Sequence, residues 1–352
     1  MLTVYTIEQS EKWDSIVCSF KDYDVYWLSG YVKAFQIHGD GEPLLFYYSD
    51  DYTRGINVVM KRDVARDERF KEKIKEGQYF DFATPYGYGG WLIEGENSDE
   101  LFNAYTTWLN RNDIVSEFVR FHPMVKNHES CTPFYEIIRL GEVVHMDLNA
   151  PEIIWDNITS KNRNMIRKAI KNGIKIYNGR FPEIYDRFRV IYNSTMDKDN
   201  AEKYYYFGKQ FYTSVLHDLP QNAQVFWAEK DEKVIAASIM IGVNGNLNYH
   251  LSGSLREYSN LAPTNLLLYE AALWGCANGY NTLYLGGGVG AGEDSLFKFK
   301  RAFYKGNLHH FYIGKRIFDE KTYQKLLDIR GNGDAEREKA LVDTGFFPLY
   351  RA

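Results

Sequence analysis

Residues 282–303, TLYLGGGVGAGEDSLFKFKRAF, combine more features of a binding site than any other window of the chain. A short apolar strand leads into three consecutive glycines, which have no Cβ and occur where the backbone turns sharply or closely approaches a ligand. Glu293 and Asp294 then precede a predicted helix, where negative charge is favourable. That helix carries Lys298, Lys300 and Arg301. The stretch predicts strand, glycine loop and helix; taken alone, it fits a ligand site and a solvated basic helix equally well.

The composition is that of an ordinary folded protein, with 45% hydrophobic and 25% charged residues. At roughly 100–200 residues per domain, 352 residues predict about two domains. The net charge of −5 argues against a wide nonspecific nucleic-acid groove but allows a local basic patch. Cys18, Cys131 and Cys276 lie far apart, without metal-ligand spacing, so we expect free thiols in a reducing cytoplasm and no metal site.

The chain shows no targeting or membrane-spanning signal. Its first residues lack a basic start followed by an apolar stretch, and no run approaches 18 apolar residues. We therefore expect a cytoplasmic protein without a transmembrane segment. Such a protein would reach a membrane-attached substrate by peripheral contact.

The predicted elements occur in the same order in both halves. The first half shows a strand at 2–7, helices at 10–18 and 28–38, a hairpin over 41–64 with its turn at 50–55, a strand from 79 that breaks into PYGYGG, a helix at 98–110 and a strand at 114–123. The second half shows a strand at 142–148, helices at 160–172 and 182–196, a hairpin over 223–243, a strand at 246–254, a helix at 264–278 and a strand at 282–285. This order favours a duplicated α+β unit, although a coincidence of common elements stays open.

Residues 160–175 contain six basic residues and no acidic residue. Arg163, Arg167 and Lys171 follow each other at helical spacing, while Ile166 and Ile170 fall on another face. Such a stripe can bind phosphates. A solvated basic helix is the other interpretation.

Aromatic residues mark two further candidate surfaces. Tyr86 and Tyr88 lie among glycines, where large side chains are placed to face something. Lys198 precedes a tyrosine cluster that includes Tyr205, a composition that suits sugar or peptide recognition and a domain interface equally.

On the predicted strand 246–254, alternation puts Asn248, His250 and Ser252 on one face. His250 is a candidate contact for a substrate amine, and a hydrogen-bonded core histidine is the alternative. The sequence contains no GxSxG, Walker A or HExxH motif. The GGGVGAG run is no dinucleotide fingerprint either, because no βαβ unit surrounds it.

Several segments resemble the Fem aminoacyltransferases (FemABX): SKNRNMIRKAIKNGIKI, YHLSGS, APTNLLLYEAALWGCANG, YLGGG and FKFKRAF. The similarity covers nearly the whole chain and is strongest over 155–315. It implies an α+β fold of two tandem GNAT-like domains, each a mixed, mostly antiparallel sheet flanked by helices. The implied domains are 1–140 and 141–315, with 316–352 packing back on a domain.

The resemblance also implies a function. Fem enzymes transfer an amino acid from aminoacyl-tRNA to an amine on a peptidoglycan precursor. We therefore expect an acyltransferase acting on a peptidoglycan or cell-surface precursor, with aminoacyl-tRNA or acyl-CoA as co-substrate and no permanently bound cofactor. An acyl-CoA-dependent N-acyltransferase on a small amine or sugar, and a non-catalytic precursor-binding module, are the alternatives.

By position in the similar segments, Phe299 and Lys300 match the family's transfer site. Lys33 matches a phosphate contact of the first domain, and Lys198 stands where the family has a substrate-binding arginine, which puts bidentate phosphate recognition in doubt. The remaining candidates are Tyr86, Tyr88, Tyr205, His250, Ser252 and Arg301 for the substrate, and Arg256, Thr264, Asn265, Gly286, Gly287 and Gly288 for the donor.

One loop of this sequence differs from the GNAT pattern in a way that affects which acyl donor it can bind. GNAT enzymes that use acetyl-CoA have a glycine-rich loop after the fourth strand, whose amides bind pyrophosphate. The corresponding loop at 256–264, REYSNLAPT, has no glycine. The expected mechanism is direct attack of an amine on an activated carbonyl, with Lys300 stabilising the oxyanion and Phe299 shaping the pocket. The base stays open between His250, Asp294 and a phosphate of the substrate.

Overall fold

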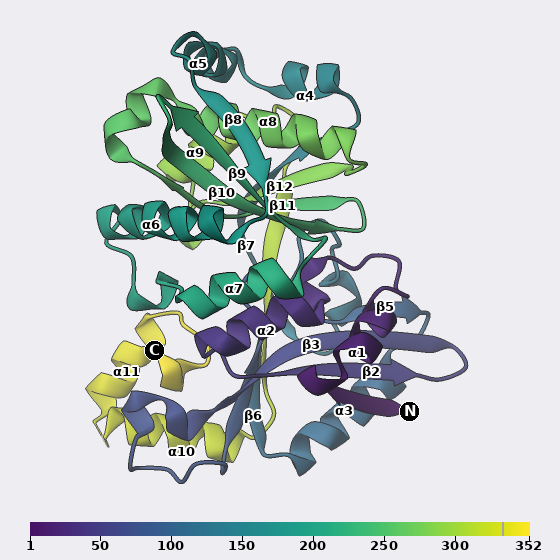
Figure 1. Cartoon of the computed structure of the whole chain (residues 1–352). Helices are drawn as coiled ribbons and strands as arrows, with labels where there is room; N and C mark the ends of the chain where they lie inside the picture. Colours follow the sequence, from purple (N-terminus) through teal and green to yellow (C-terminus); the bar gives the residue numbers. More distant parts are fainter. Residues whose placement is uncertain (333) are drawn as a thin grey trace. The chain divides into compact units, whose positions relative to one another are not determined.

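The computed structural model describes residues 1–332 and 334–352, with only the backbone considered at 291, 335 and 338. The chain forms two compact units. Unit 1 comprises residues 1–140 and 311–352, and unit 2 comprises 141–310. In Figure 1, unit 1 therefore holds both the purple start and the yellow end of the chain, and unit 2 runs through teal and green.

Each unit has its own helices. Unit 1 contains α1 (Ser10–Val17), α2 (Ser29–His38), α3 (Asp99–Arg111), α10 (Glu320–Gly331) and α11 (Ala335–Asp343). Unit 2 contains α4 (Pro151–Asn157), α5 (Ser160–Lys171), α6 (Pro182–Lys198), α7 (Lys209–Asp218), α8 (Pro263–Ala277) and α9 (Ser295–Arg301).

Each unit is built on a mixed sheet. The strands of unit 1 are ordered β1 (Leu2–Thr6), β2 (Glu42–Ser49), β3 (Thr53–Asp63), β4 (Phe80–Ala83), β6 (Ile114–Arg120) and β13 (His309–Ile317), and β5 (Leu92–Gly95) also pairs with β3. Those of unit 2 are ordered β8 (Lys175–Gly179), β9 (Ala223–Lys230), β10 (Lys233–Val243), β11 (Asn246–Ser254), β12 (Thr282–Gly286) and β7 (Glu136–Asp147).

The two sheets have the same strand directions. Among the described strand pairs within each unit, β4 with β6 and β11 with β12 are parallel, and a helix, α3 or α8, lies between the two strands in the sequence. The other described strand pairs within each unit are antiparallel. The predicted fold class, two tandem α+β units with mostly antiparallel sheets, is confirmed.

The sequence prediction misses several elements. It omits α4, α7, α11 and the strands β8 and β13. Because β13 pairs with β6, residues 311–315, which we had placed in the second domain, belong to unit 1.

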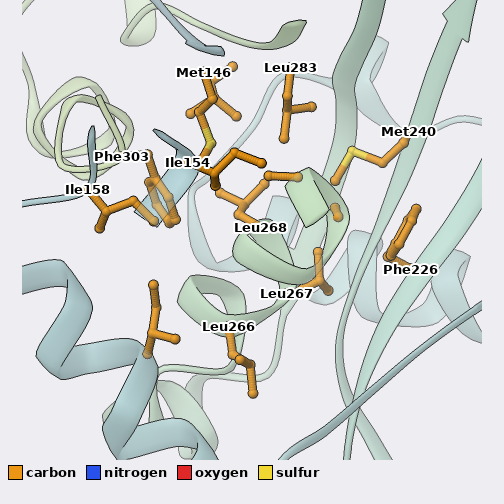
Figure 2. Close-up of a cluster of buried hydrophobic side chains, with 14 of the residues drawn as sticks. Met146, Ile154, Ile158, Phe226, Met240, Leu266, Leu267, Leu268, Leu283 and Phe303 are labelled. Atoms are coloured by element: carbon orange, nitrogen blue, oxygen red, sulfur yellow. The ribbon is translucent and has the colours of Figure 1, made fainter. Parts of the chain in front are cut away.

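The core of unit 2 explains why α8 is apolar on several sides. Leu266, Leu267 and Leu268 are consecutive and all buried, so the helix contacts apolar neighbours around much of its circumference. Figure 2 shows these leucines among side chains from the sheet, such as Met146 and Leu283. This packing fixes the first half of α8 on the sheet, and α8 connects the two parallel strands.

Candidate functional site

The two parallel strands of unit 2 separate after a short paired stretch. Asn246, Leu247 and Asn248 of β11 pair with the first three residues of β12, while β11 continues to Ser254. At the end of β12, Gly286 adopts a φ of +79°, which favours glycine, and turns the chain into the glycine loop. Residues 282–303 therefore form the predicted strand, loop and helix at the point where β11 and β12 part.

Lys300 contacts this loop directly. Its Nζ donates a hydrogen bond of 2.7 Å to the carbonyl oxygen of Gly287, and the residue is 9% exposed. A Cβ at Gly286 would lie 3.4 Å from the same Nζ. The absence of side chains in the loop thus lets a buried ammonium group lie against its backbone.

Burial lowers the pKa of Lys300 to about 8, and the nearby charge of Asp294 opposes this shift. At pH 7 the group is still mainly an ammonium ion. An ammonium has three donors, and the bond to Gly287 uses one of them. Lys300 can therefore donate to a developing oxyanion without first leaving the loop.

Asp294 shapes the loop as a cap. Its carboxylate accepts from the backbone N–H of Phe297 at 2.8 Å and of Val289 at 3.1 Å, so it joins the start of α9 to the loop. These backbone hydrogen bonds lower its pKa. A carboxylate that is stabilised in this way is a weak base, which argues against Asp294 as the proton acceptor.

Gly288 is required by the same arrangement. A Cβ there would lie 2.2 Å from the carbonyl oxygen of Gly292 and 2.4 Å from Oδ1 of Asp294. Gly286, Gly287, Gly288 and Lys300 are thus the predicted residues that the structure brings together.

Sequence reasoning missed a polar cluster on the neighbouring strand. His145 of β7 lies opposite Tyr284 of β12, whose ring is 3.8 Å from the position of a Cβ at Gly286. His145 Nε2 lies 3.4 Å from Asp147 Oδ1, and Tyr304 donates to the other oxygen of Asp147 at 3.0 Å. Burial lowers the pKa of His145. The alternating His-x-Asp spacing in 145–147 was the available signal.

A hollow of about 490 Å³ adjoins α9, with Glu142, Glu293, Phe297, Lys298, Arg301, Gly306, Asn307 and Leu308 as its lining. Both charge signs occur in this lining, as a ligand with an amine and an acidic group would require. Arg301 forms part of the wall because its guanidinium donates to the carbonyl oxygens of Tyr304 and, at 3.0 Å, Gly306.

Phe299, the other predicted transfer-site residue, is half-buried and packs against the core of unit 2. Its ring meets that of Phe303 edge-on, with centroids 5.4 Å apart. This contact orients α9 on the core.

A β-bulge changes the predicted arrangement on β11. Ser252 pairs with Ser238 and Tyr249 with Met240, whereas Asn248 pairs with Ile241. Since directly paired residues share a face, Ser252 and Asn248 lie on opposite faces, and the predicted common face is wrong. Ser252 accepts a hydrogen bond from Ser238 at 2.9 Å. His250 lies at the bulge, and burial lowers its pKa to about 3, which makes it a weak base at neutral pH.

The other candidate donor residues, Arg256, Thr264 and Asn265, lie around the start of α8. Arg256 is exposed at the beginning of a short 3-10 helix (Arg256–Leu261), and Thr264 is half-buried in the first turn of α8. Asn265 donates to Asn162 Oδ1 at 2.6 Å and so joins α8 to α5.

The remaining predicted residues occupy other elements. Lys198 ends α6 and pairs with Asp199 at 3.2 Å, and Tyr205 lies in the turn before α7, edge-on to Tyr204. In unit 1, Lys33 is exposed on α2, Tyr86 stacks on Phe35 of the same helix with centroids 5.4 Å apart, and Tyr88 is buried against Tyr26.

The described residues include no group of three or more His, Cys, Asp or Glu side chains that could hold a metal ion. Among the helices in the described ranges, none combines the length and apolar character needed to cross a bilayer.

The repeated sheet, the parting parallel strands and the glycine loop define a tandem GNAT-like fold. Residues 160–301 match the acetyltransferase (GNAT) domain family. The match lies within unit 2, the unit that carries the glycine loop and Lys300.

Solved structures extend the similarity to the whole chain. FemX superposes with a TM-score of 0.68 at 11% identity, over 92% of this chain and 99% of FemX. The lysylphosphatidylglycerol synthetase (L-PGS) from Bacillus licheniformis gives 0.58 at 16% identity, over 91% and 96%. The C-terminal domain of a putative lysylphosphatidylglycerol synthetase from Agrobacterium fabrum gives 0.57 at 14%, over 96% of both chains. No curated protein sequence matches significantly. The chain thus has the fold of Fem-type, GNAT-like acyltransferases.

Proposed function

We propose that this protein transfers an aminoacyl or acyl group to an amine on a peptidoglycan or other cell-surface precursor. The observation that carries the proposal is the buried Lys300 ammonium, 2.7 Å from the Gly287 carbonyl oxygen, where β11 and β12 separate. The fold shared with FemX and the lysylphosphatidylglycerol synthetases supports the same class of reaction.

In the proposed reaction, the lone pair of the acceptor amine attacks the carbonyl carbon of the donor ester or thioester. A C–N bond forms, and the carbonyl oxygen becomes an oxyanion that accepts from Lys300. The tetrahedral intermediate then collapses, the C–O or C–S bond breaks, and the leaving alkoxide or thiolate takes up a proton. The amine releases one proton in the same sequence, so charge and atoms balance.

Two of the three candidate bases for the amine proton are poorly suited to this role. Asp294 is engaged as a cap, and His250 has a pKa near 3. We therefore propose the remaining candidate, a phosphate of the acceptor. In that arrangement the protein contributes orientation and oxyanion stabilisation, and the substrate contributes the base.

The start of α8 favours aminoacyl-tRNA over acyl-CoA as the donor. The loop before it contains no glycine, and the helix begins with Pro263, which has no N–H to donate. Ala262 at the N-cap offers no side-chain acceptor or donor. A pyrophosphate would therefore find few of the backbone amides on which such sites depend.

Mass spectrometry with matched donor panels tests the proposal. The purified protein is incubated with aminoacyl-tRNAs and acyl-CoAs, each against lipid-linked and nucleotide-linked precursors, and the mass of every precursor is followed. We expect addition of an aminoacyl group to an amine. Saturable binding of a precursor without transfer from any donor would contradict the proposal and favour a binding module.

A thermal shift with CoA separates the two donors. A ligand at 100 times its Kd stabilises a protein by about 2.7 kcal/mol. We expect no such stabilisation by CoA. A saturable upward shift, together with transfer from acyl-CoA, would replace aminoacyl-tRNA as the donor.

A further inference from the structure

The outward face of α5 is a strip of cations that the reaction itself does not use. α5 buries Asn162, Ile166 and Ala169, and at 100° per residue the opposite side of the helix carries its basic residues. The helix contains no acidic residue. The strip consists of Lys161, Arg163, Arg167, Lys168 and Lys171, of which all but the half-buried Arg163 are exposed.

The two arginines of this strip pack on an aromatic ring, that of Trp155. The guanidinium groups of Arg163 and Arg167 lie 5.9 and 5.1 Å from the ring of Trp155. Arg163 also approaches Asp156 at 3.8 Å. The other four basic residues of the strip form no salt bridge with a carboxylate of the described residues, so their charge is available to a partner.

Two hydrogen bonds join α5 to the elements of the candidate site. The backbone N–H of Thr159, immediately before α5, donates to the carbonyl oxygen of Ala302, immediately after α9, at 3.0 Å. Asn162 accepts from Asn265 in the first turn of α8 at 2.6 Å. A ligand that lies along α5 therefore starts beside the helix that carries Lys300.

We propose that the outward face of α5 binds the phosphodiester backbone of the RNA that delivers the acyl group. This inference rests on the proposed function. Lys161 and Lys171 are ten residues apart, about 15 Å along the helix. A strip of this length matches a row of backbone phosphates, whereas CoA carries its phosphates on one nucleotide.

A membrane surface is the less suitable partner for this strip. A helix that lies in a bilayer interface needs an apolar face directed at the lipid. The apolar side of α5 is buried in unit 2, and its one large apolar side chain exposed to solvent, Ile170 at 55%, lies on the flank. The cations of the strip can attract an anionic membrane surface, but the strip has few apolar side chains that could insert into the bilayer.

The binding experiment compares two triple variants of the full-length protein with equal loss of charge. One combines Arg167→Ala, Lys168→Ala and Lys171→Ala; the control combines Lys71→Ala, Lys73→Ala and Lys75→Ala, three exposed lysines of unit 1. Unfractionated uncharged tRNA is titrated at several salt concentrations. We expect the α5 variant to bind at least tenfold more weakly at low salt, with the slope of log Kd against log salt reduced by about 0.7–0.9 per lost phosphate contact. The control should match the wild type.

A transfer experiment separates this inference from the proposed function. Full-length aminoacyl-tRNA and an aminoacylated trinucleotide serve as donors for the wild type and both variants. We expect the α5 variant to lose transfer from the full-length donor at limiting concentration and to retain transfer from the trinucleotide, which does not reach along α5. If the wild type uses neither donor, the proposed function is wrong. The tRNA titration then still tests whether the outward face of α5 binds RNA.

A third measurement compares the binding of all three proteins to phosphatidylglycerol vesicles by co-sedimentation. Three results would overturn the proposed RNA-binding surface. The α5 variant could bind tRNA with the affinity and salt slope of the control, it could lose transfer from both donors equally, or it could lose only its binding to the vesicles. Far-UV circular dichroism and the melting temperature show whether both variants are folded.

Discussion

Lys300 should be needed for turnover and not for folding. In Lys300→Met the oxyanion loses its charged donor, and we expect kcat to fall by on the order of 10²–10³. Burial of the ammonium costs stability, as its lowered pKa indicates, while loss of the bond to Gly287 costs about 1 kcal/mol. The free energy of unfolding at pH 7, measured in urea, should therefore not fall in this variant. Near wild-type turnover in a folded variant would refute the role of Lys300.

The pH dependence of turnover distinguishes two roles for Lys300. As an oxyanion donor it must be protonated, so kcat should fall as pH rises through about 8. As a base it must be neutral, and kcat would instead rise through the same range. Lys300→Arg is the control. Its guanidinium stays charged, so the decrease in kcat should occur at a higher pH.

The lowered pKa of Lys300 makes the free energy of unfolding depend on pH. Its pKa in the folded protein, about 8, lies below the ordinary 10.5. Between these values the unfolded chain binds a proton that the folded protein lacks, so the contribution of Lys300 to the unfolding free energy should rise with pH. Urea titrations of the wild type and Lys300→Met between pH 8 and 10 should diverge accordingly.

At the scale of the loop and helix α9, two glycines give a matched comparison. A methyl group at Gly288 would collide with the backbone of Gly292, so Gly288→Ala must move the loop that Lys300 contacts. At Gly290, φ is +60° but a Cβ would meet nothing within 4 Å, so Gly290→Ala should cost only the left-handed backbone penalty of about 1–2 kcal/mol. We expect a large loss of kcat in Gly288→Ala alone. Equal kcat in the two variants would show that the loop does not position the site.

At the scale of whole units, the end of the chain stabilises unit 1. Asp81 is fully buried between Arg62 and Arg351, each with a nitrogen 2.6 Å from it. Burial opposes ionisation, but the two guanidinium groups hold the pKa of Asp81 below its usual value. Arg351→Ala should lower the unfolding free energy by about 3 kcal/mol, because it leaves part of a buried charge unpaired.

Urea unfolding checks this effect, with Arg337→Ala as the control for an exposed arginine paired with Asp334. The wild-type advantage should disappear as pH falls through the lowered pKa of Asp81, since a protonated carboxyl no longer needs its cations. A difference between Arg351→Ala and wild type that persists unchanged into strong acid would contradict this account.

Local patterns in the sequence determined most of the elements and the outline of the site. The helical spacing of α5, the alternation and turns of β9 and β10, and the glycine loop before α9 all depend on neighbouring residues, whose preferences can be read without knowing their partners. Asp294 at the start of α9 is an example: its role as a cap follows from its position beside the helix.

Only the tertiary structure decided what depends on partners distant in the chain. β13 belongs to unit 1 because it pairs with β6, almost two hundred residues earlier. The bulge on β11 arises from its register with β10 and separates Asn248 from Ser252. The contact of Lys300 with Gly287 requires α9 to fold back on the end of β12. Sequence by itself determined the duplicated α+β unit and the glycine loop with its cationic helix. Long-range pairing and burial decided which of the candidate residues meet, because those energies exist only once the chain is folded.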